Sequence, residues 1–157
     1  MILLLDNVAT ADECKELIHL YHQHKHLSRY WLGSYPINTK KISHMLIDQI
    51  LQRSEKVVQK YFDPMLVVEH GEIKKTGVGA DHPLHYDSAV DPSSGYKIGL
   101  ASVMYLNDIA SGHTFFKDGL EVTPRTGRII MYDGKKYPHG VSKCLEDRYS
   151  FPIWYKK

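Results

Sequence analysis

Apolar residues in the first third of the chain recur at steps of three and four, the spacing that places them on one face of a helix. Thr10 is a good N-cap and Glu13 stands three residues later in capping-box register, so we expect a first helix over about 11–25. A second, longer helix is predicted over 43–61, and the Gly, Pro and Asn residues of 27–41 indicate a connecting loop. The apolar positions are Leu17, Ile18, Leu20 and Tyr21 in the first helix and Ile42, Met45, Leu46, Ile50, Leu51, Val57, Val58 and Tyr61 in the second.

Beyond Pro64 the pattern changes to short extended runs bounded by Gly, Pro, Asp or Asn, which are typical of strands and turns. Two helices followed by about eight such runs favour an α+β fold, with an antiparallel barrel or a double-sheet jelly roll and the helices packed on one outer face. We expect one domain over 1–157, with a helical support at 10–62 and a barrel core at 65–156. The runs are 65–73, 84–88, 97–107, 114–116, 120–122, 128–132, 138–142 and 148–155, and a short strand at 2–5 precedes the first helix.

The last run differs between its two sides, because successive residues of a strand face opposite directions. The odd-numbered residues from Tyr149 to Tyr155 are suited to a face that the helices cover. The even-numbered residues from Arg148 to Trp154 then point into the barrel. Burying a charge without a partner is costly, so an inward Arg148 predicts a bound carboxylate.

Composition and charge set limits on the partners of the protein. The 157 residues are 43% apolar and 24% charged, which is enough to close one hydrophobic core. Lys and Arg number 20 against 18 Asp and Glu, and no dense basic run is present, so the pattern does not favour a nucleic-acid partner. The apolar run 2–5 is too short to cross a bilayer and lacks the flanks of a signal peptide, so we expect a cytoplasmic protein without a membrane partner.

The cysteines and the first histidines carry little functional signal. Cys14 and Cys144 lie far apart without the paired spacing of a zinc site, and we expect both to be buried as small apolar residues. His19, His22 and His26 have helical spacing, but no acidic or cysteine partner joins them, so a solvated helix face is favoured over a metal site.

A second set of residues has the composition of a metal centre. His85 and Asp87 lie on the same face of an extended chain, and His139 stands at the head of a later predicted strand. Two histidines and one carboxylate form the facial triad of non-haem iron, which leaves positions open for substrate and dioxygen. Arg148 follows the turn 144–147, and two strands joined by this turn would set its guanidinium deeper than the metal, where it can fork onto a carboxylate.

Six short segments stand in order along the second half of the chain. They are His85-Tyr86-Asp87, Val103-Met104-Tyr105-Leu106-Asn107, Gly112-His113-Thr114-Phe115-Phe116, Pro124-Arg125-Thr126-Gly127-Arg128-Ile129-Ile130-Met131, Pro138-His139-Gly140-Val141 and Arg148-Tyr149-Ser150. In this order they resemble the prolyl-hydroxylase branch of the 2-oxoglutarate- and iron(II)-dependent dioxygenases. The resemblance runs from about residue 66 to the C-terminus, and more loosely over 6–14.

The resemblance implies a double-stranded β-helix of the jelly-roll, cupin-like kind. It implies Fe(II) held by His85, Asp87 and His139, and the co-substrate 2-oxoglutarate anchored by Arg148. Dioxygen would be the second co-substrate, carbon dioxide and succinate would be released, and ascorbate would serve as the reductant. The hydroxylated C–H bond would belong to a prolyl residue in a peptide or protein.

The resemblance also assigns the walls of the co-substrate pocket. Tyr105 matches a tyrosine that donates a hydrogen bond to the same carboxylate in the hypoxia-factor prolyl hydroxylases, and Thr114 would line the pocket. Ser150 faces inward beside Arg148, and an ordinary core tyrosine at 105 and an ordinary inward serine at 150 remain the plain alternatives. The chain departs from the family pattern at 111–113, where Ser-Gly-His replaces a paired glycine, and at 74–75, where two lysines stand where a tyrosine is frequent.

Several alternatives remain open from the sequence alone. The substrate could instead be a free amino acid, another small molecule or a nucleobase, although the stacking aromatics and basic groove of a nucleobase enzyme are not evident. A non-catalytic, cupin-like binder of a small ligand would not need an open metal site. The competing His70-Gly71-Glu72 pair is expected in an exposed hairpin, and the loop 88–96 is expected to help cover the substrate.

Overall fold

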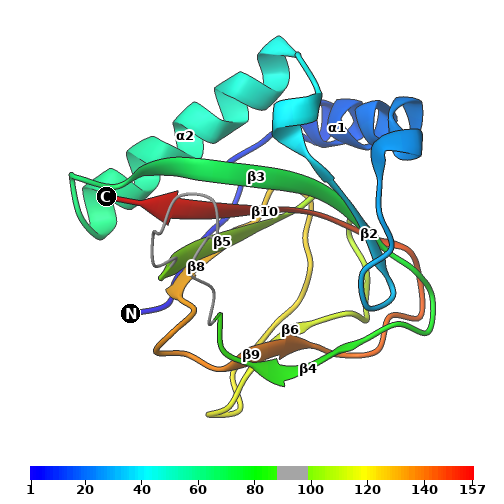
Figure 1. Cartoon of the computed structure of the whole chain (residues 1–157). Coiled ribbons are helices and arrows are strands. Elements are labelled where there is room, and N and C mark those ends of the chain that lie inside the picture. Colours follow the sequence, from blue (N-terminus) through cyan, green and yellow to red (C-terminus); the bar gives the residue numbers. More distant parts are fainter. Residues whose placement is uncertain (88–98) are drawn as a thin grey trace.

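A computed structural model describes residues 1–87 and 99–157 and shows two helices on one side of two antiparallel sheets (Figure 1). Both helices were predicted, and their ends differ from the prediction by at most a few residues. They are α1 (Ala11–Gln23) and α2 (Met45–Tyr61), with single 3-10 turns at η1 (Lys25–Leu27) and η2 (Thr39–Lys41).

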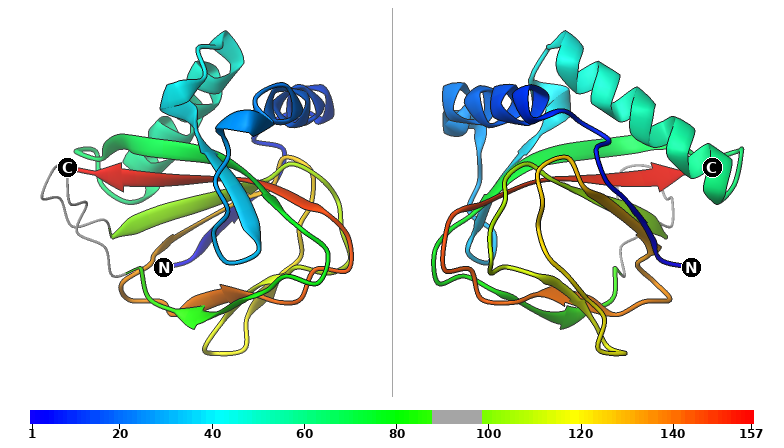
Figure 2. Two further views of the ribbon diagram at one scale, coloured as in Figure 1. Left: turned by 45° about the vertical axis from the view of Figure 1, so that its right-hand side comes forward. Right: turned by 180° about the vertical axis from the view of Figure 1, so that it is seen from behind.

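The ten strands of the described residues divide into a six-stranded and a four-stranded sheet. The larger sheet has the order β1-β8-β5-β10-β3-β2 and the smaller has the order β4-β9-β6-β7. Figure 2 shows the helices on the outer face of the larger sheet and the smaller sheet on its other side. The strands are β1 (Leu3–Leu5), β2 (Ser34–Asn38), β3 (Val67–Thr76), β4 (His82–His85), β5 (Leu100–Tyr105), β6 (Thr114–Phe116), β7 (Glu121–Val122), β8 (Ile129–Asp133), β9 (His139–Val141) and β10 (Arg148–Lys156).

The predicted layering is confirmed in part. Antiparallel strands and helices on one outer face are present as expected. The expected closed barrel is not seen, because within the described residues each sheet keeps two unpaired edges, β1 and β2 in the larger and β4 and β7 in the smaller. The molecule therefore has two facing sheets with a core on each side of the larger one.

The first core lies between the helices and the larger sheet. Leu17 of α1 and Ile50 of α2 are fully buried against the sheet residues Met104, Phe151 and Ile153. These sheet residues include odd-numbered positions of β10, so the predicted alternation along this strand is confirmed. A smaller cluster lies on the other face of the larger sheet, and its buried members are Tyr105, Phe116, Val122, Ile130 and Tyr132.

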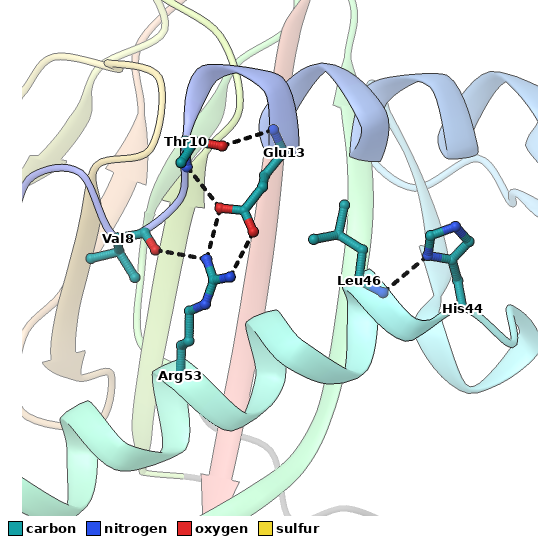
Figure 3. Close-up of polar contacts among 6 residues, drawn as sticks. All are labelled: Val8, Thr10, Glu13, His44, Leu46 and Arg53. Carbon is teal, nitrogen blue, oxygen red and sulfur yellow. Dashed lines mark hydrogen bonds and ion pairs between the residues drawn. The ribbon is translucent and has the colours of Figure 1, made fainter.

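The start of α1 is held by the predicted capping box, which also binds α2 (Figure 3). The Glu13 amide donates to Thr10 Oγ1 at 3.1 Å, and the Thr10 amide donates to Glu13 Oε1 at 2.9 Å. Arg53 of α2 forks onto the same Glu13 carboxylate at 2.8 and 2.6 Å. At the start of α2, the Leu46 amide donates to Nδ1 of His44 at 3.1 Å. The capping signal read from the sequence thus also fixes how the helices meet.

The expected hairpin between β9 and β10 is wrong. β9 belongs to the smaller sheet, whereas β10 lies inside the larger sheet between β5 and β3. The chain crosses between the sheets at the buried Cys144, whose amide donates to Ala80 O at 2.9 Å and whose carbonyl accepts from Gly79 N at 2.7 Å. His139 and Arg148 therefore approach the interior from opposite walls.

Two further predictions are corrected. The segment 27–41, expected to be a loop, contains β2, which follows a tight turn with positive φ at Leu32 and Gly33. Pro36 hid this strand, because proline is compatible with strands mainly at a sheet edge, and β2 is an edge strand. The expected exposed hairpin at His70-Gly71-Glu72 instead lies within β3, where a Cβ on Gly71 would come 2.9 Å from the Phe151 ring.

The remaining expectations about burial are confirmed. Cys14 and Cys144 are both buried and free. Burial raises the pKa of the Cys14 thiol to about 11, which keeps it neutral and apolar. Every helix in the described part of the chain is too short or too polar to cross a membrane.

Candidate metal centre and its pocket

The smaller sheet brings the three predicted metal ligands together. His85 on β4 and His139 on β9 are paired across the two strands, and Asp87 follows β4 by two residues. Nε2 of His139 lies 3.4 Å and Nε2 of His85 lies 3.6 Å from Asp87 Oδ1. One ligand atom from each residue lies within 4.8 Å of the others, and this is the one such group of three in the described residues.

Both imidazoles are oriented by their own backbone. Nδ1 of His85 contacts the Pro83 carbonyl at 2.8 Å, and Nδ1 of His139 contacts the Tyr137 carbonyl at 2.8 Å. A carbonyl oxygen can only accept, so each Nδ1 carries a hydrogen, and Nε2, which faces Asp87, is the nitrogen left to coordinate a metal. This arrangement of the outer ring nitrogens is typical of metal-binding histidines.

The position of Asp87 depends on a glycine that the sequence did not single out. The Asp87 amide donates to the Gly134 carbonyl at 2.9 Å. A Cβ on Gly134 would stand 2.1 Å from Asp87 Oδ2, so a side chain there is incompatible with the observed carboxylate. Burial works against ionisation of Asp87, but hydrogen bonds and charges from His139 and His85 outweigh it and hold the pKa of Asp87 well below its ordinary value. The same carboxylate raises the pKa of His85.

The three ligands open onto a pocket of about 90 Å³ between the two sheets. A single buried water needs roughly 10–15 Å³, so this space suits several waters or one small organic acid. Each of the two sheets contributes polar or charged side chains to the lining of this pocket. The lining residues are Trp31, Lys74, His82, His85, Asp87, Ala101, Ser102, Val103, Thr114, Tyr132, His139, Gly140, Val141, Arg148, Pro152 and Trp154.

Arg148 enters this pocket from β10 and is 2% exposed. Its Nε donates to Gly112 O at 2.9 Å, and its terminal nitrogens make longer contacts with Ser150 Oγ at 3.4 Å and Thr114 Oγ1 at 3.3 Å. Within the described residues no carboxylate forms an ion pair with it. A buried guanidinium without an anion is costly, so it indicates a site for a carboxylate ligand.

The other predicted pocket residues surround this guanidinium. Thr114 lines the pocket, and its Oγ1 lies 2.5 Å from the Tyr105 hydroxyl. Tyr105 and Ser150 are fully buried behind it, with the Tyr105 ring centroid 5.3 Å from the Arg148 Cζ. Gly112 has φ +62°, and a Cβ there would come 3.0 Å from Arg148 Cδ, so the single glycine of 111–113 is required beside the arginine.

Several lining residues were not assigned to the pocket from the sequence. Trp31 comes from the turn before β2, and Tyr132 packs its ring 4.6 Å from that of His139. His82 is buried within β4, and Lys74 was noted only as a departure from the family pattern. Lys74 could have been predicted as a pocket residue only from the strand register, because its pairing with Ser150 places its side chain on the same face of the sheet as that of Arg148. The predicted covering loop 88–96 lies outside the described residues.

Two facing antiparallel sheets bring two histidines, one carboxylate and a buried arginine to one pocket, and two histidines with one carboxylate are the donor set of mononuclear non-haem iron oxygenases. The sequence comparison agrees: the chain belongs to the 2OG-Fe(II) oxygenase superfamily, whose family model matches residues 71–156. The resemblance to 2-oxoglutarate oxygenases of the prolyl-hydroxylase kind is thereby confirmed. No curated protein matches the chain by sequence.

Solved structures share the fold at low sequence identity. A Pseudomonas putida prolyl-4-hydroxylase is 17% identical with a TM-score of 0.80, covering 99% of this chain and 92% of that one. A viral collagen prolyl hydroxylase from Paramecium Bursaria Chlorella virus-1, in a 2OG complex, is 16% identical with a TM-score of 0.79 and coverages of 99% and 94%. The epimerase SnoN, in complex with Fe3+, alpha ketoglutarate and nogalamycin RO, is 13% identical with a TM-score of 0.82 and coverages of 99% and 78%.

Proposed function

We propose that this protein is an iron(II)- and 2-oxoglutarate-dependent dioxygenase that hydroxylates a C–H bond, with a prolyl residue of a peptide or protein as the leading substrate. One observation carries the proposal: His85, Asp87 and His139 converge within 4.8 Å in the same pocket as Arg148, a buried cation. A non-catalytic binder has no need for both an open triad and an unpaired guanidinium.

The donor set suits iron. His85 and His139 would coordinate through Nε2, because each Nδ1 is already bonded to a carbonyl, and Asp87 would coordinate through its carboxylate. Two nitrogens and one oxygen on one side of a metal leave positions for a chelating keto acid and dioxygen. Iron, when bound, supplies dioxygen activation and the oxidation of a C–H bond.

Arg148 would bind the far carboxylate of 2-oxoglutarate, because its terminal nitrogens make only long contacts in the present arrangement. Tyr105 and Thr114 would complete this end of the pocket through their shared hydrogen bond. In the overall reaction one oxygen atom enters the alcohol product and the other enters succinate, while carbon dioxide is lost. The protein contributes orientation of both co-substrate ends and partial exclusion of water.

The prolyl substrate is the finer part of the proposal. It is supported by the motif order of residues 85–150 and by prolyl hydroxylases among the solved structures that share the fold. An epimerase also shares the fold, so a small-molecule substrate is the second candidate. Ascorbate as reductant, a covering role for 88–96, and a double-stranded β-helix in a cytoplasmic protein complete the proposal.

An anaerobic titration tests the proposed site first. Fe(II) and 2-oxoglutarate added together should produce a visible charge-transfer band in the wild-type protein. The His85→Ala variant should lose the band, and the exposed His26→Ala variant should retain it. A wild-type protein without the band contradicts the assignment. Proline-containing peptides are then incubated with the loaded protein in air, and a gain of one oxygen by mass spectrometry identifies the prolyl substrate.

A further inference from the structure

Two neighbouring lysines on β3 have opposite environments. Lys75 points outward and forms an ion pair with Asp147 at 3.4 Å. Lys74 points to the other face, lines the metal pocket and makes no ion pair within the described residues. Burial and the charge of Arg148 lower the pKa of Lys74 to about 8, so the ammonium remains mostly charged at pH 7. The pocket thus holds a second cation.

Strand register places this cation between the anchor and the metal. Arg148 is paired with Thr76 and Ser150 with Lys74, so Lys74 stands one side-chain repeat further along the sheet, about 7 Å. The metal end of the same face is marked by Tyr132, whose ring contacts that of His139. Tyr132 pairs with Ala101, and Ala101 pairs with Trp154 of β10. Trp154 lies four residues beyond Ser150, the partner of Lys74, so Tyr132 stands two side-chain repeats beyond Lys74. Lys74 therefore faces the middle of the pocket and not its closed end.

A count of charges shows that the co-substrate does not neutralise the pocket. Iron(II) brings two positive charges, Asp87 removes one, and Arg148 and Lys74 each add one. The 2-oxoglutarate dianion leaves one positive charge uncompensated, and a buried excess charge is unfavourable. Glu72, the next acid on the inward face of β3, is already engaged by Arg29 at 3.9 Å.

His82 provides a second, independent observation beside Lys74. It is 7% exposed and lines the pocket, yet within the described residues its Nε2 is buried without a hydrogen-bond partner. A neutral imidazole with its hydrogen on Nε2 can donate to an anion, and a buried donor without an acceptor is costly.

We propose that Lys74, together with His82, forms a subsite for a carboxylate of the prime substrate. This inference rests on the proposed function and narrows it: the enzyme selects a substrate that carries a carboxylate close to the oxidised C–H bond. For a prolyl substrate, that carboxylate belongs to the proline itself, as in a C-terminal prolyl residue or free proline. A proline inside a peptide chain would leave Lys74 without its anion.

The tryptophans of the chain provide a binding signal that does not depend on turnover. The chain has two tryptophans, Trp31 and Trp154, and both line the pocket. Protein loaded anaerobically with Fe(II) and 2-oxoglutarate is titrated with N-acetylproline and, separately, with the uncharged N-acetylprolinamide, while tryptophan fluorescence is recorded. We expect the acid to bind at least about 10-fold more tightly than the amide, since tenfold corresponds to one modest charge-assisted contact.

Variants at the two lysines test the role of Lys74. Lys74→Met should remove the preference for the acid, Lys74→Arg should retain most of it, and the matched Lys75→Met variant should leave it unchanged. The dissociation constant for 2-oxoglutarate should change less than about twofold in all three. Thermal unfolding of each variant shows whether it is folded before its titration is interpreted.

Three results would overturn the inference: equal binding of acid and amide, no detectable binding of the acid, or a Lys74→Met variant that weakens 2-oxoglutarate binding tenfold. The last would assign Lys74 to the co-substrate. A failure of the proposed function is separate, because it appears as a missing charge-transfer band before any proline derivative is added. A parallel titration with L-proline distinguishes a free amino acid from an acylated C-terminal residue as the source of the carboxylate.

Discussion

On the face of the larger sheet that the helices cover, Ile73, Met104 and Phe151 are fully buried and belong to one apolar cluster. On the opposite face, the same strands present Lys74 and Arg148 to a polar pocket. The two faces differ by one residue of register. The helix-covered face therefore supplies stability, whereas the pocket face holds charges that, in the proposed function, bound ligands would pair.

Two arginines make the same contrast. Arg53 in the helical layer forks onto Glu13 at 2.8 and 2.6 Å, so its charge is matched within the chain. Arg148 is far more buried and has no acidic partner in the described residues. If Arg148 served only stability, we would expect an acidic partner for it within the chain, because a buried charge without a partner is destabilising.

The largest expected effect comes from removing one of the three proposed metal-coordinating side chains on the pocket face. His139→Ala should lower turnover by more than about 10⁴-fold, the scale seen when one member of a catalytic unit is lost. The unfolding free energy of the metal-free protein should hardly change. Turnover and the anaerobic charge-transfer band are compared with those of His19→Ala, an exposed histidine of α1. Retention of the band in His139→Ala would remove this residue from the centre.

The next effect concerns the helix-covered face. Phe151→Ala should lower the unfolding free energy by about 3–5 kcal/mol, because a fully buried ring is replaced by a cavity. Denaturant unfolding measures the change, and Val78→Ala, at a position 67% exposed, is the control. At temperatures where the variant is folded, its affinity for iron should equal that of the wild type. A loss of iron affinity in the folded variant would show that the faces are coupled.

Unlike Phe151→Ala, the Arg148→Met substitution should weaken ligand binding and leave stability nearly unchanged. Affinity for 2-oxoglutarate should fall by about 100-fold, since truncating one side of a buried charge pair costs roughly 2–5 kcal/mol. The ligand-free protein should change in stability by no more than about 1 kcal/mol, because the unmatched charge is removed with its hydrogen bonds. Binding is followed by the charge-transfer band, with the exposed Arg125→Met as control. A stability loss as large as that of Phe151→Ala would mean that Arg148 is structural.

Gly134→Ala tests the close approach that positions Asp87. The added Cβ would overlap the carboxylate at 2.1 Å, so Asp87 must move and iron affinity should fall by about 10–100-fold. Gly77→Ala is the matched control, because the nearest atom to its Cβ is 4.0 Å away. Metal titrations of both variants give the comparison. Equal affinities would mean that the loop around Gly134 relaxes without disturbing the site.

The smallest effect is the pH dependence of the helical layer. The hydrogen bond from Arg53 lowers the pKa of Glu13 from 4.5 to about 2. A depressed pKa stabilises the folded state above the ordinary pKa, and this contribution is lost as the pH falls from about 4.5 toward 2. After allowance for solvent screening it is about 1 kcal/mol. The difference in unfolding free energy between wild type and Glu13→Gln should therefore shrink between pH 6 and pH 3, and a constant difference would contradict this account.

Much of the architecture could be predicted from local patterns. The capping box at Thr10 and Glu13 marked the first helix, and two-residue alternation marked the two faces of β10. The spacing of His85 and Asp87, with a distal histidine and arginine, indicated the pocket that the structure describes. The capping box and the alternation are local, because each depends on residues a few positions apart in one element, whereas the distal histidine and arginine were found from their residue types and order along the chain.

Other features could not be predicted, because they depend on which strands are neighbours. The sequence places Arg148 nine residues after His139 and suggested a hairpin, but the chain crosses from one sheet to the other. The edge strand β2 was hidden by its proline. Gly134 matters only because the Asp87 carboxylate comes to rest against it.

What the sequence by itself determined was the set of chemical groups, the helices and the face on which each strand residue lies, since these follow from side-chain identity and backbone periodicity. Only the tertiary structure decided that, among the described residues, Lys74 has no acidic partner while Lys75 has one, and that His82, which lines the same pocket, has a buried nitrogen without a hydrogen-bond partner. Whether a charge is matched depends on what lies across the sheet, and that is set by strand order over the whole chain.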